Sequence, residues 1–91
     1  MVEIIFSKLF QENYSNRIFS SLKLSDRFTE RVKIFSRNPA DPILGDHSLQ
    51  GEMKLYRAFS ITGDIRVIYQ IIGNQTVKFI AIGTHEQVYK K

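Results

Sequence analysis

The sequence predicts an α+β domain in which two N-terminal helices pack on a small, mainly antiparallel sheet, with the element order β-α-α-β-β-β. Three observations favour this fold class. Before residue 38, apolar residues recur about every four positions, which is helical spacing. After residue 52, runs rich in β-branched and aromatic residues are separated by glycine-containing dipeptides. The length of 91 residues fits one domain, which we expect to span residues 1–91.

The first strand and the first helix are expected at the N-terminus. Residues 2–6, VEIIF, form an apolar, β-branched run that is typical of a strand. Ser7 follows and is a suitable N-cap, because its hydroxyl can accept a hydrogen bond from an amide of the first helical turn. The apolar stripe of this helix consists of Phe10, Tyr14, Ile18 and Leu22.

A second helix is expected after the interruption SSLKLSD, residues 20–26, with Ser25 and Asp26 as candidate N-caps. Its apolar stripe consists of Leu24, Phe28, Val32 and Phe35. The helix should end before Pro39, since proline lacks an amide hydrogen and restricts the residue that precedes it. Residues 38–52 are rich in turn-forming residues and predict a long loop, a kind of segment that often carries function in compact domains.

The last part of the chain predicts an antiparallel meander. Gly63-Asp64 and Gly73-Asn74 are typical of two-residue hairpin turns. Each lies between runs of alternating, β-favouring residues. The strands are expected over residues 53–62, 65–72 and 76–82.

The first hairpin turn also predicts a register. A two-residue turn pairs Thr62 with Ile65, and paired side chains share one face of the sheet. This register places Arg57 on the same face as Arg66. In the last strand, every second residue shares this face, and that series leads towards His85. The opposite face would be covered by the helices and would carry Tyr56, Ala58, Val67, Tyr69, Ile71, Ile80 and Ile82.

Composition and charge narrow the class of protein. A hydrophobic fraction of 43% argues against a disordered chain. Cysteine is absent, which removes disulfides and thiolate metal ligands and is typical of a reducing compartment. Because no apolar run is long enough to cross a membrane and the N-terminus lacks a basic leader, we expect a cytoplasmic protein without a membrane partner. The formal net charge of +4 favours a polyanionic partner such as nucleic acid.

A few polar residues are candidates for function. His85 follows a predicted strand, and histidine can donate or accept a proton near neutral pH; the alternative is a surface histidine that caps a turn. Arg66 lies inside a strand, where it is either solvent-exposed or bound to an anion such as phosphate. A helical turn at the C-terminus would place Tyr89 beside His85. The other histidine, His47, is far away in sequence, so we expect no metal site.

Motifs within residues 38–89 resemble the RelE superfamily of bacterial type II toxins, and most closely the branch that includes YafQ. The matching elements are DHSLQG at 46–51, YRAF at 56–59, IRVIY at 65–69 and GTHEQVY at 83–89. The resemblance implies a RelE-like β-α-α-β-β-β fold. It also implies a ribosome-dependent messenger-RNA endonuclease, or mRNA interferase, that needs neither a metal nor another cofactor.

The resemblance further implies a reaction and partners. In such toxins the ribose 2′-hydroxyl attacks the neighbouring phosphate, which leaves a cyclic phosphate on one product and a 5′-hydroxyl on the other. The implied partners are the ribosome with messenger RNA in its A site and a cognate antitoxin. We expect the antitoxin to be acidic, to be encoded alongside, and to form a hetero-oligomer with the toxin.

The matching motifs imply a role for individual residues. His85 matches the catalytic histidine of the GTH motif and is expected to be the general acid. Arg66 matches a strand arginine that stabilises the transition state. His47 matches the loop histidine and is either a second acid–base group or a phosphate ligand. The residues expected to bind RNA are Arg57, Asp64 and Tyr89.

Three positions depart from the family pattern. Ser60 stands where the YafQ branch has a histidine, Ala58 where it has an aspartate, and Phe59 where RelE has a lysine. The resemblance therefore leaves the general base open, and Arg66 is a candidate to compensate, since arginine and lysine replace histidine in the RelE branch. Two other functions of this fold also stay open: a ParE-like toxin that inhibits DNA gyrase by binding, and a degenerate toxin that binds its antitoxin without activity. The pair of His85 and Tyr89 favours the nuclease, because a gyrase-binding protein needs no ionisable group there.

Overall fold

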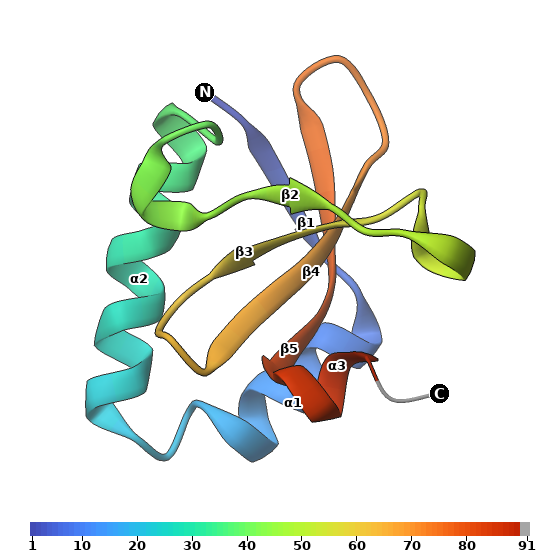
Figure 1. The fold of residues 1–91 in the computed structure, drawn as a ribbon. Coiled ribbons are helices and arrows are strands. Elements are labelled where there is room, and N and C mark those ends of the chain that lie inside the picture. Colours follow the sequence, from blue (N-terminus) through green and yellow to red (C-terminus); the bar gives the residue numbers. More distant parts are fainter. Residues whose placement is uncertain (90–91) are drawn as a thin grey trace.

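The computed structural model describes residues 1–89 and has the predicted α+β fold, with helices packed on a mainly antiparallel sheet (Figure 1). The strand order is β1-β5-β4-β3-β2; β1 runs parallel to β5, and the other neighbours are antiparallel. The strands are β1 Glu3–Phe6, β2 His47–Ser48, β3 Arg57–Ser60, β4 Ile65–Ile71 and β5 Thr76–Thr84. The helices are α1 Lys8–Arg17, α2 Leu22–Arg37 and α3 His85–Tyr89, with short 3-10 helices η1 Pro42–Leu44 and η2 Gly51–Met53.

Serine side chains begin both N-terminal helices. Ser7 Oγ accepts a hydrogen bond from an amide of the first turn of α1 at 2.9 Å, so this predicted N-cap is confirmed. The predicted cap of the second helix is wrong, because Ser21 caps α2 by accepting from the Leu24 amide at 3.2 Å. Ser25 lies inside α2, where its hydroxyl donates to the Leu22 carbonyl. Leu22 therefore belongs to α2 and not to the stripe of α1.

The segment predicted as a loop over residues 38–52 contains more regular structure than expected. η1 and η2 add single turns, and β2 pairs with β3 so that His47 lies opposite Ala58. The next strand begins only at Arg57, because η2 and the turn after it occupy the residues before Tyr56. His47 thus lies on the edge of the sheet instead of on a free loop.

The predicted register of the β3–β4 hairpin is wrong by one residue. Ser60 pairs with Arg66, and Arg57 pairs with Tyr69. The turn is longer than two residues because Thr62 Oγ1 accepts hydrogen bonds from two amides that follow it, and this local bonding competes with strand pairing. A shift of one residue exchanges the faces of a strand. Arg57 and Arg66 therefore point to opposite faces of the sheet.

A β-bulge changes the register of the next hairpin. Tyr69 pairs with Phe79, but Ile68 pairs with Ala81, so Ile80 has no partner in β4. The extra residue switches the side chains of β5 to the other face partway along the strand. Phe79 and Ile82 are both buried although they are three positions apart.

The sheet separates two apolar clusters. The larger cluster lies between the sheet and helices α1 and α2, and Phe35 of α2 stacks there on Phe59 of β3 with ring centroids 4.6 Å apart. The smaller cluster lies on the other face, where Val88 of α3 packs with Ala58 and Ile68. α3 is therefore anchored on the face of the sheet that α1 and α2 leave open.

The prediction of which strand residues face the helices is correct only in part. Val67, Tyr69 and Ile82 belong to the larger cluster, as expected. Ala58 and Ile80 belong to the smaller cluster on the opposite face. The shifted register and the bulge account for this division.

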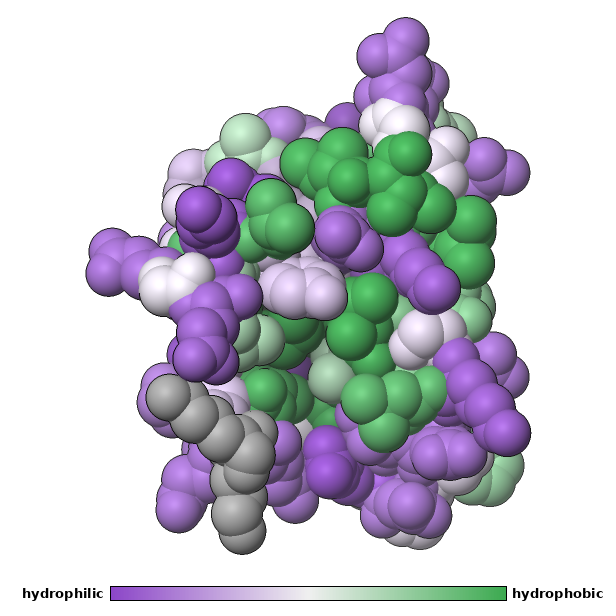
Figure 2. All heavy atoms as spheres, turned by 90° about the vertical axis from the view of Figure 1, so that its right-hand side faces the viewer, coloured by the Kyte–Doolittle hydropathy of each residue, from purple (hydrophilic) through white to green (hydrophobic). Residues whose placement is uncertain are grey.

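Part of the surface is apolar. Figure 2 shows the side of the molecule that faces right in Figure 1, where apolar side chains gather among polar ones. Large apolar side chains that are exposed include Ile5, Leu55 and Ile72. Within residues 1–89, no helix has the length and the hydropathy needed to cross a membrane.

Candidate active site

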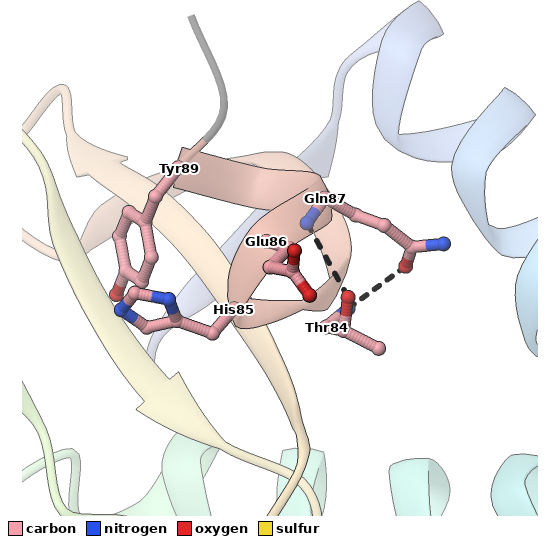
Figure 3. A pocket seen from close by; sticks show the side chains of 5 residues that line it. All are labelled: Thr84, His85, Glu86, Gln87 and Tyr89. Atoms are coloured by element: carbon pink, nitrogen blue, oxygen red, sulfur yellow. Dashed lines mark hydrogen bonds between the residues drawn. The ribbon is translucent and has the colours of Figure 1, made fainter.

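The helix α3 starts directly after β5 and is held by a capping box. The Gln87 amide donates to Thr84 Oγ1 at 3.3 Å, and the Thr84 amide donates to Gln87 Oε1 at 2.8 Å (Figure 3). The sequence pattern Thr-x-x-Gln encodes this reciprocal pair of bonds. A helix this short is marginal by itself, so the capping box and the burial of Val88 determine the orientation of His85.

His85 and Tyr89 lie side by side on α3. Their ring centroids are 4.4 Å apart and the ring planes meet at 62° (Figure 3). This contact confirms the expectation that a C-terminal helical turn brings the two side chains together. Tyr89 is half-buried whereas His85 is exposed, so the tyrosine supports one side of an imidazole that remains accessible.

His47 is placed by the edge strand β2 and by a bond to its own loop. Its Nδ1 lies 3.0 Å from the carbonyl oxygen of Gly45, the residue that ends η1 with a φ of 58° in the left-handed region. A carbonyl oxygen only accepts hydrogen bonds, so Nδ1 must carry the proton. In the neutral ring, Nε2 is then free to accept one.

Arg66 extends from β4 on the same face of the sheet as His47. It pairs with Ser60 on one side and with Gly83 on the other, while His47 lies in the row of Ala58 and Ile68. Residues two apart on a strand share a face and are separated by about 7 Å along it. The strand pairing thus brings the imidazole and the guanidinium to neighbouring positions.

One nitrogen of Arg66 lacks a partner. Its Nε is buried and finds no hydrogen-bond acceptor among residues 1–89. A buried donor without an acceptor costs about 1–3 kcal/mol, and an acceptor atom of a ligand would remove this cost. Arg31 Nε is also without a hydrogen bond, but it lies 3.9 Å from the carboxylate of Glu30.

A cleft of about 420 Å³ joins these side chains. It is lined by His47, Ser48, Leu49, Gln50, Met53, Arg66, His85 and Tyr89. A second, adjoining hollow of about 620 Å³ lies over α3 and shares His85 and Tyr89 with the first (Figure 3). Four of the six predicted site residues therefore line one cleft, and Arg57 and Asp64 do not.

Arg57 instead belongs to a partly buried polar cluster with Asp46, the residue before His47, and with Tyr69. Its Nε and Nη2 both lie 2.7 Å from Oδ1 of Asp46, and the Tyr69 hydroxyl donates to Oδ2 of the same carboxylate. The Asp46 side chain is only 7% exposed, whereas that of Arg57 is 37% exposed. The hydrogen bond to Asp46 raises the pKa of Arg57, and burial, together with its bond to Asp46, raises the pKa of Tyr69.

Asp64 is exposed in the β3–β4 turn, where its amide donates to Thr62 Oγ1 at 3.1 Å. The next residue, Ile65, pairs with Thr84, which immediately precedes His85. The turn therefore lies at the same end of the sheet as α3, although Asp64 does not line the cleft.

Two parts of the site were not predicted from the sequence. The first is Asp46, whose position beside a candidate histidine was a usable signal. The second is the capping role of Thr84 and Gln87, which the pattern Thr-x-x-Gln indicates. Within residues 1–89, no three His, Cys, Asp or Glu side chains are grouped in a way that could hold a metal ion.

The chain matches a known protein family over nearly its whole length. The family model described as "Bacterial toxin of type II toxin-antitoxin system, YafQ" matches residues 2–90. No curated protein matches the chain in sequence.

Several solved structures share the fold. A mutant of YafQ from E. coli is 21% identical, with a TM-score of 0.79 over 98% of this chain and 99% of that chain. A copper-bound mutant toxin from Helicobacter pylori is 22% identical, with a TM-score of 0.74 over 98% of this chain and 100% of that one. A chain of the E. coli DinJ-YafQ complex is 21% identical, with a TM-score of 0.68 over 98% and 99% of the two chains. At these identities the likeness establishes a common fold.

Proposed function

Because the chain belongs to the YafQ family of toxins from bacterial type II toxin–antitoxin systems, we propose that it cleaves messenger RNA on the ribosome. The observation that carries the proposal is the single cleft lined by His47, Arg66 and His85. Cleavage by a ribose 2′-hydroxyl requires a proton acceptor, a proton donor and a cation at the phosphate. These three side chains can provide all three functions.

The two histidines divide the proton transfers. His47 Nε2 accepts the proton of the 2′-hydroxyl, which suits a ring whose Nδ1 is bonded to the Gly45 carbonyl. The 2′-oxygen then forms a bond to phosphorus, the bond from phosphorus to the 5′-oxygen breaks, and His85 donates a proton to the leaving oxygen. The products are a 2′,3′-cyclic phosphate and a 5′-hydroxyl. Each positioned acid or base typically contributes about 10²–10⁴-fold to the rate.

Arg66 supplies the charge that the transition state needs. Negative charge accumulates on the non-bridging phosphate oxygens as the 2′-oxygen attacks, and a guanidinium can bond two such oxygens at once. The buried Nε, which has no acceptor among residues 1–89, would gain one from the phosphate. Loss of one preorganised donor of this kind typically costs about 10²–10³-fold in rate.

The remaining predicted RNA contacts are proposed at the rim of the site. Tyr89 presents an aromatic ring beside His85 on which a base can stack. Asp64, exposed at the same end of the sheet, can accept hydrogen bonds from a ribose or a base amino group. Arg57 is already paired with Asp46, so we assign it to the support of the cleft and not to RNA.

We also propose an acidic antitoxin, encoded alongside, and the ribosome as partners. The formal net charge of +4 favours an acidic protein and ribosomal RNA. Exposed apolar side chains on the face shown in Figure 2 support a protein partner as well. The solved E. coli DinJ-YafQ toxin–antitoxin complex contains a chain of the same fold.

Variants expressed in bacteria test the proposal. His85→Ala removes the proton donor, and His47→Asn removes Nε2 while its amide can still donate to Gly45. We expect each variant to relieve growth arrest and to cut translated messages at least about 10²-fold more slowly, as measured by primer extension. Glu12→Ala, on the exposed surface of α1 and outside both hollows, is the control and should stay toxic.

The same experiment separates the nuclease from other functions. Thermal unfolding of the purified variants shows whether they are folded. Full toxicity of folded His85→Ala and His47→Asn would contradict the catalytic assignment. Arrest of replication with broken DNA, and with messages intact, would indicate a gyrase inhibitor instead.

A further inference from the structure

On the side of β5 that faces away from β4, a neighbouring strand covers only about half of the edge. β1 pairs with residues from Thr76 to Phe79, whereas β5 continues to Thr84. Backbone amides and carbonyls that are buried at a sheet edge need other partners. The part of β5 that leads to His85 therefore depends on groups outside the sheet.

Side chains of α1 and of its N-cap residue provide these partners. The Ser7 hydroxyl donates to the Ile80 carbonyl at 3.0 Å, at the bulge. Further along, Asn13 Oδ1 accepts from the Ile82 amide at 3.2 Å, and Arg17 Nη1 donates to the Ile82 carbonyl at 2.8 Å. Asn13 and Arg17 are four residues apart on α1 and share one face of the helix. Together they bond both polar groups of one residue, as a neighbouring strand would.

The two bonds from Asn13 and Arg17 to Ile82, here called the clamp, lie directly before α3, the helix that carries His85. Ile82 is followed by Gly83 and by Thr84, which caps α3. A Cβ atom at position 83 would lie 2.7 Å from Arg17 Nη1 and 2.6 Å from Gln87 Oε1. Arg17 and the capping glutamine therefore share the space that a side chain at 83 would fill.

We propose that Asn13 and Arg17 are positioning residues that hold the β5–α3 junction and thereby fix His85 in the cleft. The proposal rests on the nuclease function argued above. Asn13 is 7% exposed, a polar side chain buried in a bond to the backbone of β5. A displacement of about 1 Å at a reacting group can cost about 10²-fold in rate, so a clamp that touches no substrate can still control the reaction.

Substitution of Arg17 tests the proposal. Arg17→Met keeps the aliphatic part but removes the bond to Ile82, and Arg17→Lys restores a donor. Arg37→Met on the exposed end of α2 removes the same charge elsewhere and is the matched control. We expect Arg17→Met to lower kcat for message cleavage about 10²-fold with KM within about twofold of the parent value, and Arg17→Lys to recover most of the loss.

Nuclear magnetic resonance of Val88 and Ile68 gives a second readout that needs no activity, because these side chains pack together where α3 meets the sheet. Arg17→Met should weaken the nuclear Overhauser contacts between Val88 and Ile68, and Arg37→Met should leave them unchanged. Val88–Ile68 contacts and kcat at parent values in Arg17→Met would overturn the proposal. If the parent protein cuts no message, the nuclease function fails, whereas the Val88–Ile68 contacts still decide whether Asn13 and Arg17 hold α3 in place.

Asn13 provides a check should Arg17→Met not fold. Asn13→Leu removes the acceptor for the Ile82 amide, whereas Asn13→Asp keeps an acceptor oxygen at that place. We expect weakened Val88–Ile68 contacts in Asn13→Leu and recovered contacts in Asn13→Asp. Equal Val88–Ile68 contacts in Asn13→Leu and the parent would contradict the proposal.

Discussion

Arg57 and Arg66 lie on neighbouring strands and have different partners. Arg57 is neutralised by the buried carboxylate of Asp46, and the pair ties β3 to the segment that carries His47. Arg66 has no carboxylate within salt-bridge distance among residues 1–89 and lines the cleft instead. A buried carboxylate next to one guanidinium thus leaves the other free for an anionic ligand.

This difference was not predictable from residue types alone. The sequence indicated correctly that Arg66 occupies a strand and that His85 follows one. It misplaced Arg57 because a hairpin turn of two residues was assumed, whereas the hydroxyl of Thr62 lengthens the turn. The polar bond of one side chain therefore decided which face each arginine occupies.

Tyr69 provides a prediction about stability at high pH. Its pKa is raised by burial and by the bond to Asp46. The unfolded chain therefore loses the phenolic proton at about pH 10, whereas the folded protein still keeps it. The unfolded state then binds fewer protons, and stability must fall as pH rises above that point. Tyr69→Phe should be less stable near neutral pH by about 1–3 kcal/mol but should lose stability less steeply in alkali.

Urea unfolding of the parent and Tyr69→Phe between about pH 7 and pH 11 measures both effects. Tyr14, whose pKa is also raised by burial, titrates in both proteins and cancels in the comparison. Parallel stability curves for the two proteins would show that Tyr69 does not titrate in the unfolding equilibrium.

The structural elements follow local rules that differ in how clearly they appear in a sequence. Ser7 was recognised as a cap because a strand ends just before it. Ser21 was missed because Ser25 and Asp26 offered an equally good pattern four positions later. The bulge at Ile80 leaves no mark in the sequence, since it results from how β4 and β5 fit together.

α3 is the element on which the site depends most, and its capping box can be tested. Gln87→Glu preserves the capping box, whereas Gln87→Ala removes the bond to the Thr84 amide. Loss of a cap of this kind costs about 0.5–2 kcal/mol, and a helix of five residues has too few other bonds to stay folded after that loss. We expect Gln87→Ala to lose most message cleavage while its melting temperature changes little, and Gln87→Glu to remain active.

Amide hydrogen exchange of α3 completes this test. Residues of α3 should exchange faster in Gln87→Ala than in Gln87→Glu, with exchange in β4 unchanged. Equal protection of α3 in the two variants, or equal activity, would show that the capping box does not hold the helix.

In the whole molecule, the larger apolar core and the cleft lie on opposite faces of the sheet. One face buries the aromatic cluster of Phe35 and Phe59 under α1 and α2. The other carries the cleft and only a small apolar cluster, anchored by Val88. The fold class was predictable because helical and strand periodicities occupy separate parts of the chain. The division between faces was not, because it depends on register.

We propose that RNA bound in this cleft is cut by attack of the RNA's own 2′-hydroxyl, without a metal-activated water. The most direct measurement is the chemistry of the cut ends of a message translated in a reconstituted system. We predict 5′-ends that accept an adapter only after phosphorylation by a kinase, and 3′-ends that carry a 2′,3′-cyclic phosphate. Both ends should be lost with His85→Ala. Cut ends with a 5′-phosphate and a free 3′-hydroxyl, produced by the parent protein and absent with His85→Ala, would contradict the mechanism.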